Sequence, residues 1–195
     1  MSKAKKSISP LRRGGEGFFL PSAGKSLPKD LLGIKELARP TIEKVLDSAR
    51  EFKKESQPLL RGKTIINLFF EPSTRTRTSF ELAARRLGAQ VIGMLPQTSS
   101  LTKGESLKDM VENLEAMHPD LLVVRHAASG VPGLVASYTR AGVINAGDGS
   151  HEHPTQALVD LFTVREILGK IAGLRLVIVG DLAYSRVARS NIYAF

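Results

Sequence analysis

Residues 64–81 read TIINLFFEPSTRTRTSFE, and this stretch joins an apolar run directly to a helical pattern. The run 64–70 is typical of a strand buried in the middle of a sheet. The helical pattern covers 74–87, with apolar residues at spacings i, i+3, i+4 and i+7, namely Phe80, Ala83, Ala84 and Leu87. Ser73, just before it, is a favourable N-cap residue. A strand that leads straight into a helix is the repeating unit of an α/β fold.

The first turn of this helix has an unusual charge. A helix N-terminus carries partial positive charge and favours acidic residues, but Arg75 and Arg77 lie there, with no acid before Glu81. Free N–H groups, hydroxyls and guanidinium groups together favour an anion, and phosphate suits them. Arg75, with the threonines on either side, is the predicted phosphate clamp, whereas Arg77 is predicted to form a structural ion pair with Glu71. The alternative is an ordinary surface helix start with two solvated arginines.

The chain after Gly62 alternates between short apolar runs and helical patterns. Strands are predicted at 64–70, 90–95, 121–125, 143–145 and 175–180, and helices at 74–87, 105–117, 130–140 and 154–168. A further helix is predicted from Ile34 to about Lys54, with a fresh start after Pro40. The alternation predicts an α/β fold, a doubly wound parallel sheet with helices on both faces. Ligands of such sheets bind beyond the carboxyl ends of the strands.

The sequence divides into three parts. Residues 1–30 form an irregular leader, in which seven basic and two acidic residues contribute +5 of the net charge of +9. Residues 31–172 are predicted to form one complete domain. Residues 173–195 hold one predicted strand and part of a helix, which cannot make a sheet alone. We expect them to be the first βα unit of a second α/β domain that continues past residue 195.

Composition limits the classes of protein that fit. The 195 residues are 42% hydrophobic, which supports a core, and no apolar run reaches the roughly 20 residues that a membrane helix needs. There is no cysteine, which excludes disulfides and thiolate metal sites and is compatible with a cytoplasmic protein. The basic leader carries no nucleic-acid-binding motif. The remaining positive charge indicates anionic substrates, and neither a membrane nor nucleic acid is an expected partner.

Two further polar motifs follow predicted strands. Arg125 comes directly after the strand 121–125, where ligands bind, although it can also be a residue whose charged end reaches into water. The motif GDGSHEHPTQ at 147–156 places His153 at a helix cap, with Pro154 at the first helical position. Gln156 lies about one turn later, and its amide can both donate and accept hydrogen bonds. His151 and His153 with one glutamate are weak support for a metal site, and no metal is predicted.

Two other segments have less specific patterns. The polar, lysine-containing stretch 97–105 is either a mobile loop over an anion site or a plain surface loop. Gly180 follows the last predicted strand, but the glycines of a dinucleotide-binding turn do not follow it, so no nicotinamide cofactor is expected. Arg186, early in the next helix, is a candidate for binding a carboxylate.

Taken in order, these motifs resemble the catalytic chains of aspartate carbamoyltransferases, within the aspartate/ornithine carbamoyltransferase superfamily. The resemblance runs from about Leu31 to the end of the chain. It rests on FFEPSTRTR at 69–77, Ser99 to Glu105, VRH at 124–126, NAGDG with HPTQ at 145–156, and VGD with Ser185-Arg186. The STRTR and HPTQ motifs are shared with ornithine carbamoyltransferases, whereas the NAGDG lead-in, the Ser-x-x-x-Lys loop and the GDLxYxR turn favour the aspartate branch.

The resemblance implies transfer of a carbamoyl group from carbamoyl phosphate to L-aspartate in pyrimidine biosynthesis, without a cofactor. It implies that the phosphate is held by Ser73, Thr74, Arg75 and Thr76. The carbamoyl oxygen would contact Thr76, Arg125 and His153, and the carbamoyl NH2 would contact Gln156. Arg186 and Lys103 would bind aspartate, with Lys103 and Ser99 reaching in from a neighbouring subunit of a homotrimer.

The resemblance leaves open regulatory or dihydroorotase-like partner chains. Because the family's second domain extends past residue 195, we expect this chain alone to bind phosphate-like anions weakly and to turn over little or nothing. Two alternatives remain at this stage. One is an ornithine-type carbamoyltransferase, and the other is a non-catalytic fragment that acts as an assembly module.

Overall fold

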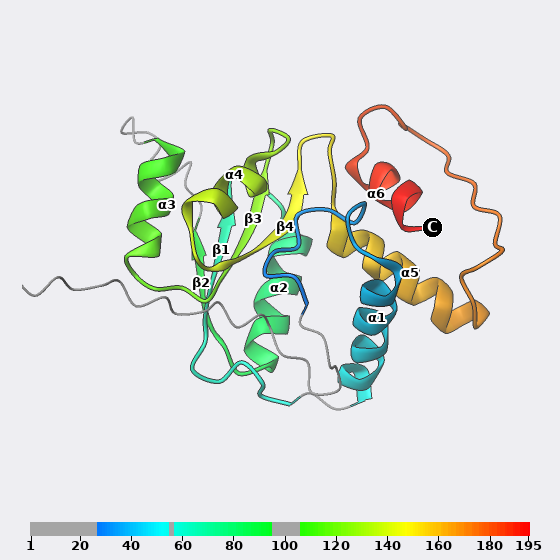
Figure 1. Ribbon diagram of the computed structural model, residues 1–195, viewed down its shortest axis with the longest axis horizontal. Helices are drawn as coiled ribbons and strands as arrows, with labels where there is room; N and C mark the ends of the chain where they lie inside the picture. Colours follow the sequence, from blue (N-terminus) through cyan, green and yellow to red (C-terminus); the bar gives the residue numbers. More distant parts are fainter. Residues whose placement is uncertain (1–26, 55–56, 95–105) are drawn as a thin grey trace, which may run out of the picture.

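The computed structural model describes residues 27–54, 57–94 and 106–195. Its centre is a four-stranded sheet in the order β2-β1-β3-β4, in which every pairing is parallel (Figure 1). The strands are β1 (Thr64–Phe69), β2 (Gln90–Met94), β3 (Leu121–His126) and β4 (Gly142–Asp148). The chain lays β2 on one side of β1 and then crosses to lay β3 on the other side. The carboxyl ends of β1 and β3 therefore flank the point where the strand order reverses.

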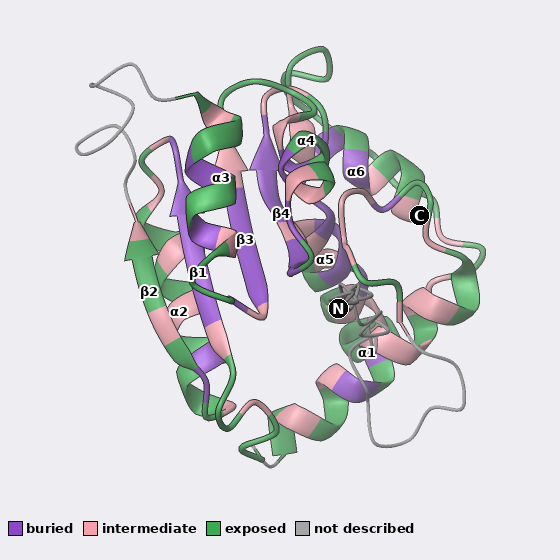
Figure 2. Ribbon diagram, turned by 60° about the vertical axis from the view of Figure 1, so that its left-hand side comes forward, coloured by how far each residue is buried: buried purple, intermediate pink, exposed green. Residues whose placement is uncertain are grey.

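Helices cover both faces of the sheet, as the sequence predicted. Figure 2 shows α3 (Leu107–Glu115) and α4 (Val131–Tyr138) in front of the sheet, with α2 (Thr74–Arg86) and α5 (Pro154–Leu168) behind it. Both α1 (Arg39–Lys54) and α6 (Arg186–Ala194) pack against α5. The fold class is thus a doubly wound α/β sheet. Among the described residues, none of the helices has the length and apolar character that crossing a membrane demands.

The alternation of side chains along β1 explains how one strand serves two cores. Ile66 and Leu68 point to one face and pack with Met110 and Val111 of α3. Ile65 and Phe69, which precede and follow this pair along the strand, point to the other face and pack with Ala84 of α2. Since both faces are covered, apolar residues occur on both sides of the strand, interrupted only by the buried Asn67.

The described segment before α1 is fastened to the last strand of the sheet. Leu31 pairs with β4, donating its N–H to Val143 at 2.8 Å and accepting from Asn145 at 2.9 Å. Ile34 is buried, and its N–H donates to the Glu152 carboxylate at 2.7 Å. The sequence predicted that the helix would begin at Ile34. This prediction is wrong, because the backbone of Ile34 is used by its bond to Glu152. The helix begins at Arg39 instead, so that Pro40 occupies the first turn, where its missing N–H has no cost.

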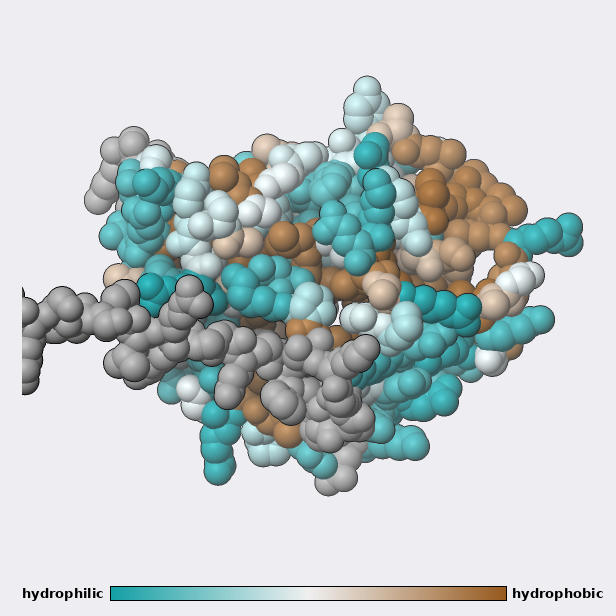
Figure 3. Space-filling view, in the orientation of Figure 1, coloured by the Kyte–Doolittle hydropathy of each residue, from teal (hydrophilic) through white to brown (hydrophobic). Residues whose placement is uncertain are grey.

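The predicted strand at 175–180 is wrong, because the structure has no strand between α5 and α6. Figure 1 shows this connection, drawn in orange, looping away from the sheet. Its β-branched residues match a strand pattern, but a strand needs a partner, and Val177 and Val179 are 81% and 92% exposed. Figure 3 shows hydrophobic residues gathered on this side of the molecule, around α6. The division into a first domain and the beginning of a second stays a prediction.

Candidate functional site

The candidate site lies at the carboxyl ends of β1 and β3, where the strand order reverses. The two ends are joined by a hydrogen bond in which the Phe70 N–H donates to the carbonyl of Arg125 at 2.9 Å. The loop that leads into α2 leaves β1 at this point, and Arg125 is the fifth residue of β3. The sheet therefore brings together two of the sequence motifs, as expected for the ligand-binding edge of an open α/β sheet.

The N-terminus of α2 has no capping side chain and no acidic residue to accept hydrogen bonds from its first N–H groups. Ser73 is the N-cap residue in an extended conformation, and its side chain makes no capping hydrogen bond. The first turn contains no acidic residue. Arg75 is exposed, and no carboxylate of the described residues lies within 4.0 Å of its guanidinium. Thr74 and Thr76 lie beside it in the same turn, so the predicted phosphate-binding group is assembled on one helix end.

The predicted partner of Arg77 is wrong. Arg77 pairs with Glu81 one turn along α2, with 3.6 Å between its Nε and the carboxylate oxygen. Residues four apart on a helix are neighbours, and this geometry was available from the sequence. Glu71 instead forms ion pairs with Arg125 and Arg186.

Glu71 joins Arg125 and Arg186, which lie 61 positions apart in the sequence. Its Oε1 accepts from the Nη2 of Arg125 at 2.7 Å and from the Nη2 of Arg186 at 2.6 Å. The three side chains are only 13–21% exposed. A single carboxylate thus faces two guanidinium groups, so this part of the site keeps a net positive charge. The sequence placed both arginines in the site but not the carboxylate that holds them together.

The environment of Arg125 is unfavourable to its own charge. Burial lowers the pKa of its guanidinium, and the nearby charge of Arg186 lowers it further, whereas Glu71 raises it. Its Nη1 donates to the carbonyl of Ala146 at 3.1 Å, which directs the guanidinium toward the end of β4. Its Nε has no hydrogen-bond partner among the described residues. An anion bound here would therefore relieve repulsion between the two arginines.

His153 enters the site from the start of α5. It is the N-cap residue of α5, and its buried N–H donates to the Ser190 hydroxyl of α6 at 2.9 Å. Its imidazole Nδ1 lies 3.3 Å from the Thr155 hydroxyl. Burial, followed by the charges of Arg125 and Arg186, lowers the pKa of His153 to about 4. The imidazole is therefore neutral at physiological pH, with one N–H available as a donor.

We expect the stability of the protein to fall as the pH is lowered from about 6.5 to about 4, because His153 takes up a proton more readily in the unfolded chain. The full effect is at most about 3 kcal/mol and is absent above pH 6.5, where both states are neutral. Urea unfolding at a series of pH values measures it. The His153→Gln variant should lose this part of the pH dependence, and an identical slope in both proteins would contradict the assignment.

Gly147 lies next to the side chains of Arg125, His153 and Arg186. A Cβ at this position would lie 3.0 Å from Arg125 Nη1, 3.1 Å from His153 Cδ2 and 3.3 Å from Arg186 Cδ. Its φ of +111° also lies in the region that only glycine adopts readily. Three candidate side chains, from β3, from the start of α5 and from α6, therefore converge around one small residue. The motif at 147–156 contained this glycine, but the sequence alone gave it no role.

The substitution Gly147→Ala should destabilise the protein by about 1–3 kcal/mol, because it combines backbone strain with displacement of Arg125 and His153. Chemical denaturation measures this change. The matched control is Gly133→Ala in α4, where a Cβ meets nothing within 4 Å. That substitution should stabilise the helix by about 0.5–1 kcal/mol. Equal effects of the two substitutions would show that Gly147 has no special constraint.

Two buried carboxylates shape the loop between β4 and α5. Asp148 accepts from Asn145 Nδ2 at 2.8 Å and from the N–H of Gly130 at 2.6 Å. Glu152 accepts from Ser190 Oγ at 3.1 Å, in addition to its bond with Ile34. The loop that presents His153 is thus tied to β4, to α6 and to the segment before α1. None of these ties was predicted, and those with Gly130, Ser190 and Ile34 join residues 18, 38 and 118 positions apart.

Of the remaining predicted site residues, Gln156 is described by the structure and two others are not. Gln156 lies in the first turn of α5, and its Nε2 donates to Asp160 at 2.9 Å. This bond turns the amide oxygen away from Asp160 and leaves it as the acceptor. Ser99 and Lys103 lie outside the described residues. Within the described part of the chain, no cluster of three or more histidine, aspartate or glutamate residues could hold a metal ion.

Comparison with known proteins gives one consistent result. Residues 29–166 match the family model described as aspartate/ornithine carbamoyltransferase, carbamoyl-P binding domain. The chain is 58% identical over 171 residues to the aspartate carbamoyltransferase catalytic subunit of Sorangium cellulosum, covering 85% of this chain and 53% of that protein. The chain spans about half the length of the curated relatives it matches.

Solved structures agree in fold. The aspartate transcarbamoylase of Trypanosoma cruzi, determined with carbamoyl phosphate and with N-(phosphonacetyl)-L-aspartic acid, superposes with a TM-score of 0.80 at 33% identity. The match covers 85% of this chain and 55% of that one. The catalytic subunit of M. jannaschii aspartate transcarbamoylase gives a TM-score of 0.79 at 42% identity, and the match covers 86% of this chain and 56% of that one.

Proposed function

The chain belongs to the aspartate/ornithine carbamoyltransferase family, and on that premise we propose that it binds carbamoyl phosphate and serves transfer of the carbamoyl group to L-aspartate. The observation that carries the proposal is the cationic site at the reversal point of the sheet. There, the acid-free start of α2 follows shortly after Glu71, the carboxylate that pairs with both Arg125 and Arg186. The reaction is proposed from the names of the relatives, and the role of each side chain is proposed from its position and chemistry.

The phosphate of the donor would lie at the N-terminus of α2. Ser73, Thr74, Arg75 and Thr76 would bind it, because backbone N–H groups, hydroxyls and a guanidinium all favour a doubly charged anion. Neither the free hydroxyl of Ser73 nor the exposed guanidinium of Arg75 has another role among the described residues. Phosphate is the leaving group, so the same contacts that bind it also stabilise the charge it carries away.

The carbamoyl group would lie between Arg125, His153 and Gln156. Attack by the amine of aspartate on the carbamoyl carbon builds negative charge on the carbamoyl oxygen. Arg125 supplies a cation and His153 a neutral N–H donor, with Thr76 at the α2 side. Gln156, whose NH2 is held by Asp160, would accept from the carbamoyl NH2 through its oxygen. The new C–N bond replaces the C–O bond to phosphate, and the amine releases a proton to solvent.

Arg186 would bind a carboxylate of aspartate, which favours this acceptor over ornithine. Its side chain comes from α6 and adjoins Arg125 through Glu71, while its Nη1 has no hydrogen-bond partner among the described residues. An acidic acceptor meets a cation here, whereas the ammonium of ornithine would meet repulsion. Lys103, supplied with Ser99 by a neighbouring subunit of a homotrimer, would add a second cation. We also propose that residues 173–195 begin the aspartate-binding domain, and that the reaction serves pyrimidine biosynthesis in the cytoplasm.

Calorimetric titration with three phosphonates tests the proposal. N-(phosphonacetyl)-L-aspartate should bind at least about tenfold more tightly than phosphonoacetate, since one charged hydrogen bond contributes about 1.5–3 kcal/mol. The ornithine counterpart should show no such gain. Arg186→Ala should remove the gain and leave phosphonoacetate binding intact. If the ornithine counterpart binds best, the acceptor is wrong, and if no phosphonate binds, the donor site is wrong.

A further inference from the structure

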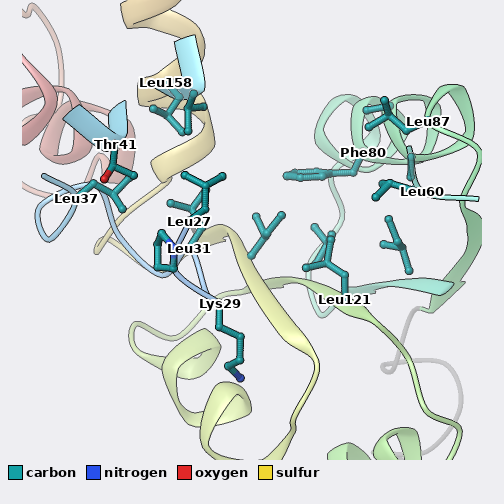
Figure 4. A pocket seen from close by; sticks show the side chains of 17 residues that line it. Leu27, Lys29, Leu31, Leu37, Thr41, Leu60, Phe80, Leu87, Leu121 and Leu158 are labelled. Atoms are coloured by element: carbon teal, nitrogen blue, oxygen red, sulfur yellow. The ribbon is translucent and has the colours of Figure 1, made fainter. Parts of the chain in front are cut away.

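Helix α5 has an apolar side and a polar side. Figure 4 shows Leu158 on the side that borders an apolar pocket, and Leu158 packs there with Ile34 and Leu46. Asp160 lies about 200° further around the helix, since each residue turns it by about 100°. It is half-buried and bonded to α6. The polar side of α5 therefore carries Asp160 together with Gln156, which lies one turn earlier and next to the candidate site.

Asp160 holds two amide groups at once. Its Oδ1 accepts from Nε2 of Gln156 at 2.9 Å, and its Oδ2 accepts from Nδ2 of Asn191 in α6 at 2.8 Å. An ionised carboxylate only accepts hydrogen bonds, so each amide must present its NH2 group to it. Neither amide can reverse without placing two oxygens against each other. The oxygen of Gln156 is therefore held on the side away from Asp160.

The alternative is an ordinary pair of neighbours on one helix, since glutamine and aspartate four residues apart stabilise a helix modestly. Two observations favour a further role. Asn191 belongs to another helix, and its Oδ1 is buried without a partner among the described residues, which is unfavourable. The charge of Asp160 also reaches the site. Burial and then Arg125 and Arg186 lower the pKa of His153, whereas Asp160 raises it.

We propose that Asp160 is a positioning residue, which fixes the orientation of the Gln156 amide and so makes the site prefer a carbamoyl group to an acyl group that ends in methyl. This inference rests on the proposed function, in which the oxygen of Gln156 accepts from the carbamoyl NH2. A methyl group in the same place has no proton to donate, so that oxygen loses its hydrogen bond. Without Asp160, the amide would have to lose its freedom on binding, which weakens the contact.

Three phosphonates test the orientation of Gln156. Phosphonoacetamide carries a carbonyl and an NH2 group, acetonylphosphonate replaces that NH2 by methyl, and methylphosphonate keeps only the anion. Titration calorimetry with the 195-residue chain measures the affinity of each. The unmodified protein should bind phosphonoacetamide about tenfold more tightly than acetonylphosphonate, because the methyl compound leaves an acceptor unpaired.

Two substitutions that remove the same charge separate orientation from electrostatics. Asp160→Ala should lower the preference to about threefold or less, because Gln156 is then free to rotate. Asp160→Asn keeps an oxygen that can accept from Gln156, and its new NH2 can donate to the Oδ1 of Asn191 once that amide reverses. The preference of this variant should stay within about twofold of that of the unmodified protein. His153 stays neutral in both variants, because its pKa is about 4 and loss of Asp160 lowers it further.

Each outcome has a separate meaning. If none of the phosphonates binds, the proposed donor site is wrong and the inference is wrong with it. If methylphosphonate binds but the unmodified protein does not distinguish the other two compounds, Gln156 does not contact the NH2 group. Equal preferences for Asp160→Ala and Asp160→Asn would show that Asp160 acts through its charge or not at all. Either of the last two results overturns the inference and leaves the anion site in place.

Nitrogen-15 NMR of the unmodified protein gives a second measurement, which does not depend on the folding of a variant at position 160. The side-chain NH2 signals of Gln156 are identified by their absence from Gln156→Glu. Phosphonoacetamide should shift these signals no more than acetonylphosphonate does, because the NH2 group of Gln156 faces Asp160 and not the ligand. A clearly larger shift with phosphonoacetamide would show the reverse orientation and overturn the inference.

Discussion

Glu71→Gln is expected to lower the melting temperature of the protein by about 4–12 °C, the largest effect of any single change in the site. The substitution keeps the size of the side chain but removes the charge that Arg125 and Arg186 share. Breaking a buried pair typically costs about 3–5 kcal/mol, and partial exposure reduces this to about 2–3 kcal/mol. For a domain of this size, each kcal/mol corresponds to about 2–4 °C.

Two controls separate this effect from a general loss of charge. Glu81→Gln removes the longer and more exposed pair with Arg77 and should cost less than about 1 kcal/mol. Combining Glu71→Gln with Arg186→Met should recover part of the loss, because it removes one of the two opposed cations. Added phosphate should raise the melting temperature of Glu71→Gln more than that of the unmodified protein, since the arginines would then lack a carboxylate. If Glu71→Gln and Glu81→Gln have equal effects, the shared carboxylate is not important.

Arg75→Ala should weaken binding of phosphate and of carbamoyl phosphate by about 10- to 150-fold, which corresponds to the 1.5–3 kcal/mol of a hydrogen bond to a charged group. Because Arg75 is exposed, its removal should change stability by no more than about 0.5 kcal/mol. Phosphorus NMR or calorimetry measures the affinity, and urea unfolding measures the stability. A loss of affinity without a loss of stability identifies a binding residue.

The control for Arg75→Ala is Arg85→Ala on the same helix. Arg85 is also exposed but lies in the last turn of α2, about three turns from the proposed phosphate site. Removing it leaves the net charge of the protein equal to that of Arg75→Ala, so any general electrostatic attraction of anions is matched. Phosphate binding should be nearly unchanged. Equal losses in the two variants would mean that phosphate responds only to overall charge, and the helix N-terminus would not be its site.

The strands could be predicted from local patterns wherever an apolar run had a neighbouring strand to pair with. The apolar runs that became β1 to β4 and the helix 154–168 were identified, the latter with both ends correct and with Gly169 in the left-handed conformation as its stop. The run at 175–180 has the same composition, yet it forms no strand. Composition reports the preference of a segment, whereas a strand also requires a partner.

The candidate residues could be predicted from the sequence, whereas their contacts could not. Arg75, Arg125, His153 and Arg186 were candidates because each lies at the end of a strand or the start of a helix, which are positions defined by the chain itself. The role of Glu71 depends on Arg125 and Arg186 being brought together by the sheet and by α6. The same is true of Gly147, whose neighbours come from three elements. The sequence therefore identifies candidate site residues, but only the tertiary structure shows which of them contact one another.

The pairing of Leu31 with β4 has a consequence for the order of folding. The tie between Leu32 and Asn145 joins residues 113 positions apart. At about 5–20 residues per second, the ribosome needs roughly 6–23 s to add that much chain. During this time the residues ahead of α1 have no strand to join, and closing so long a loop makes the step slow. We therefore expect these residues to acquire protection from hydrogen exchange last during refolding, together with β4.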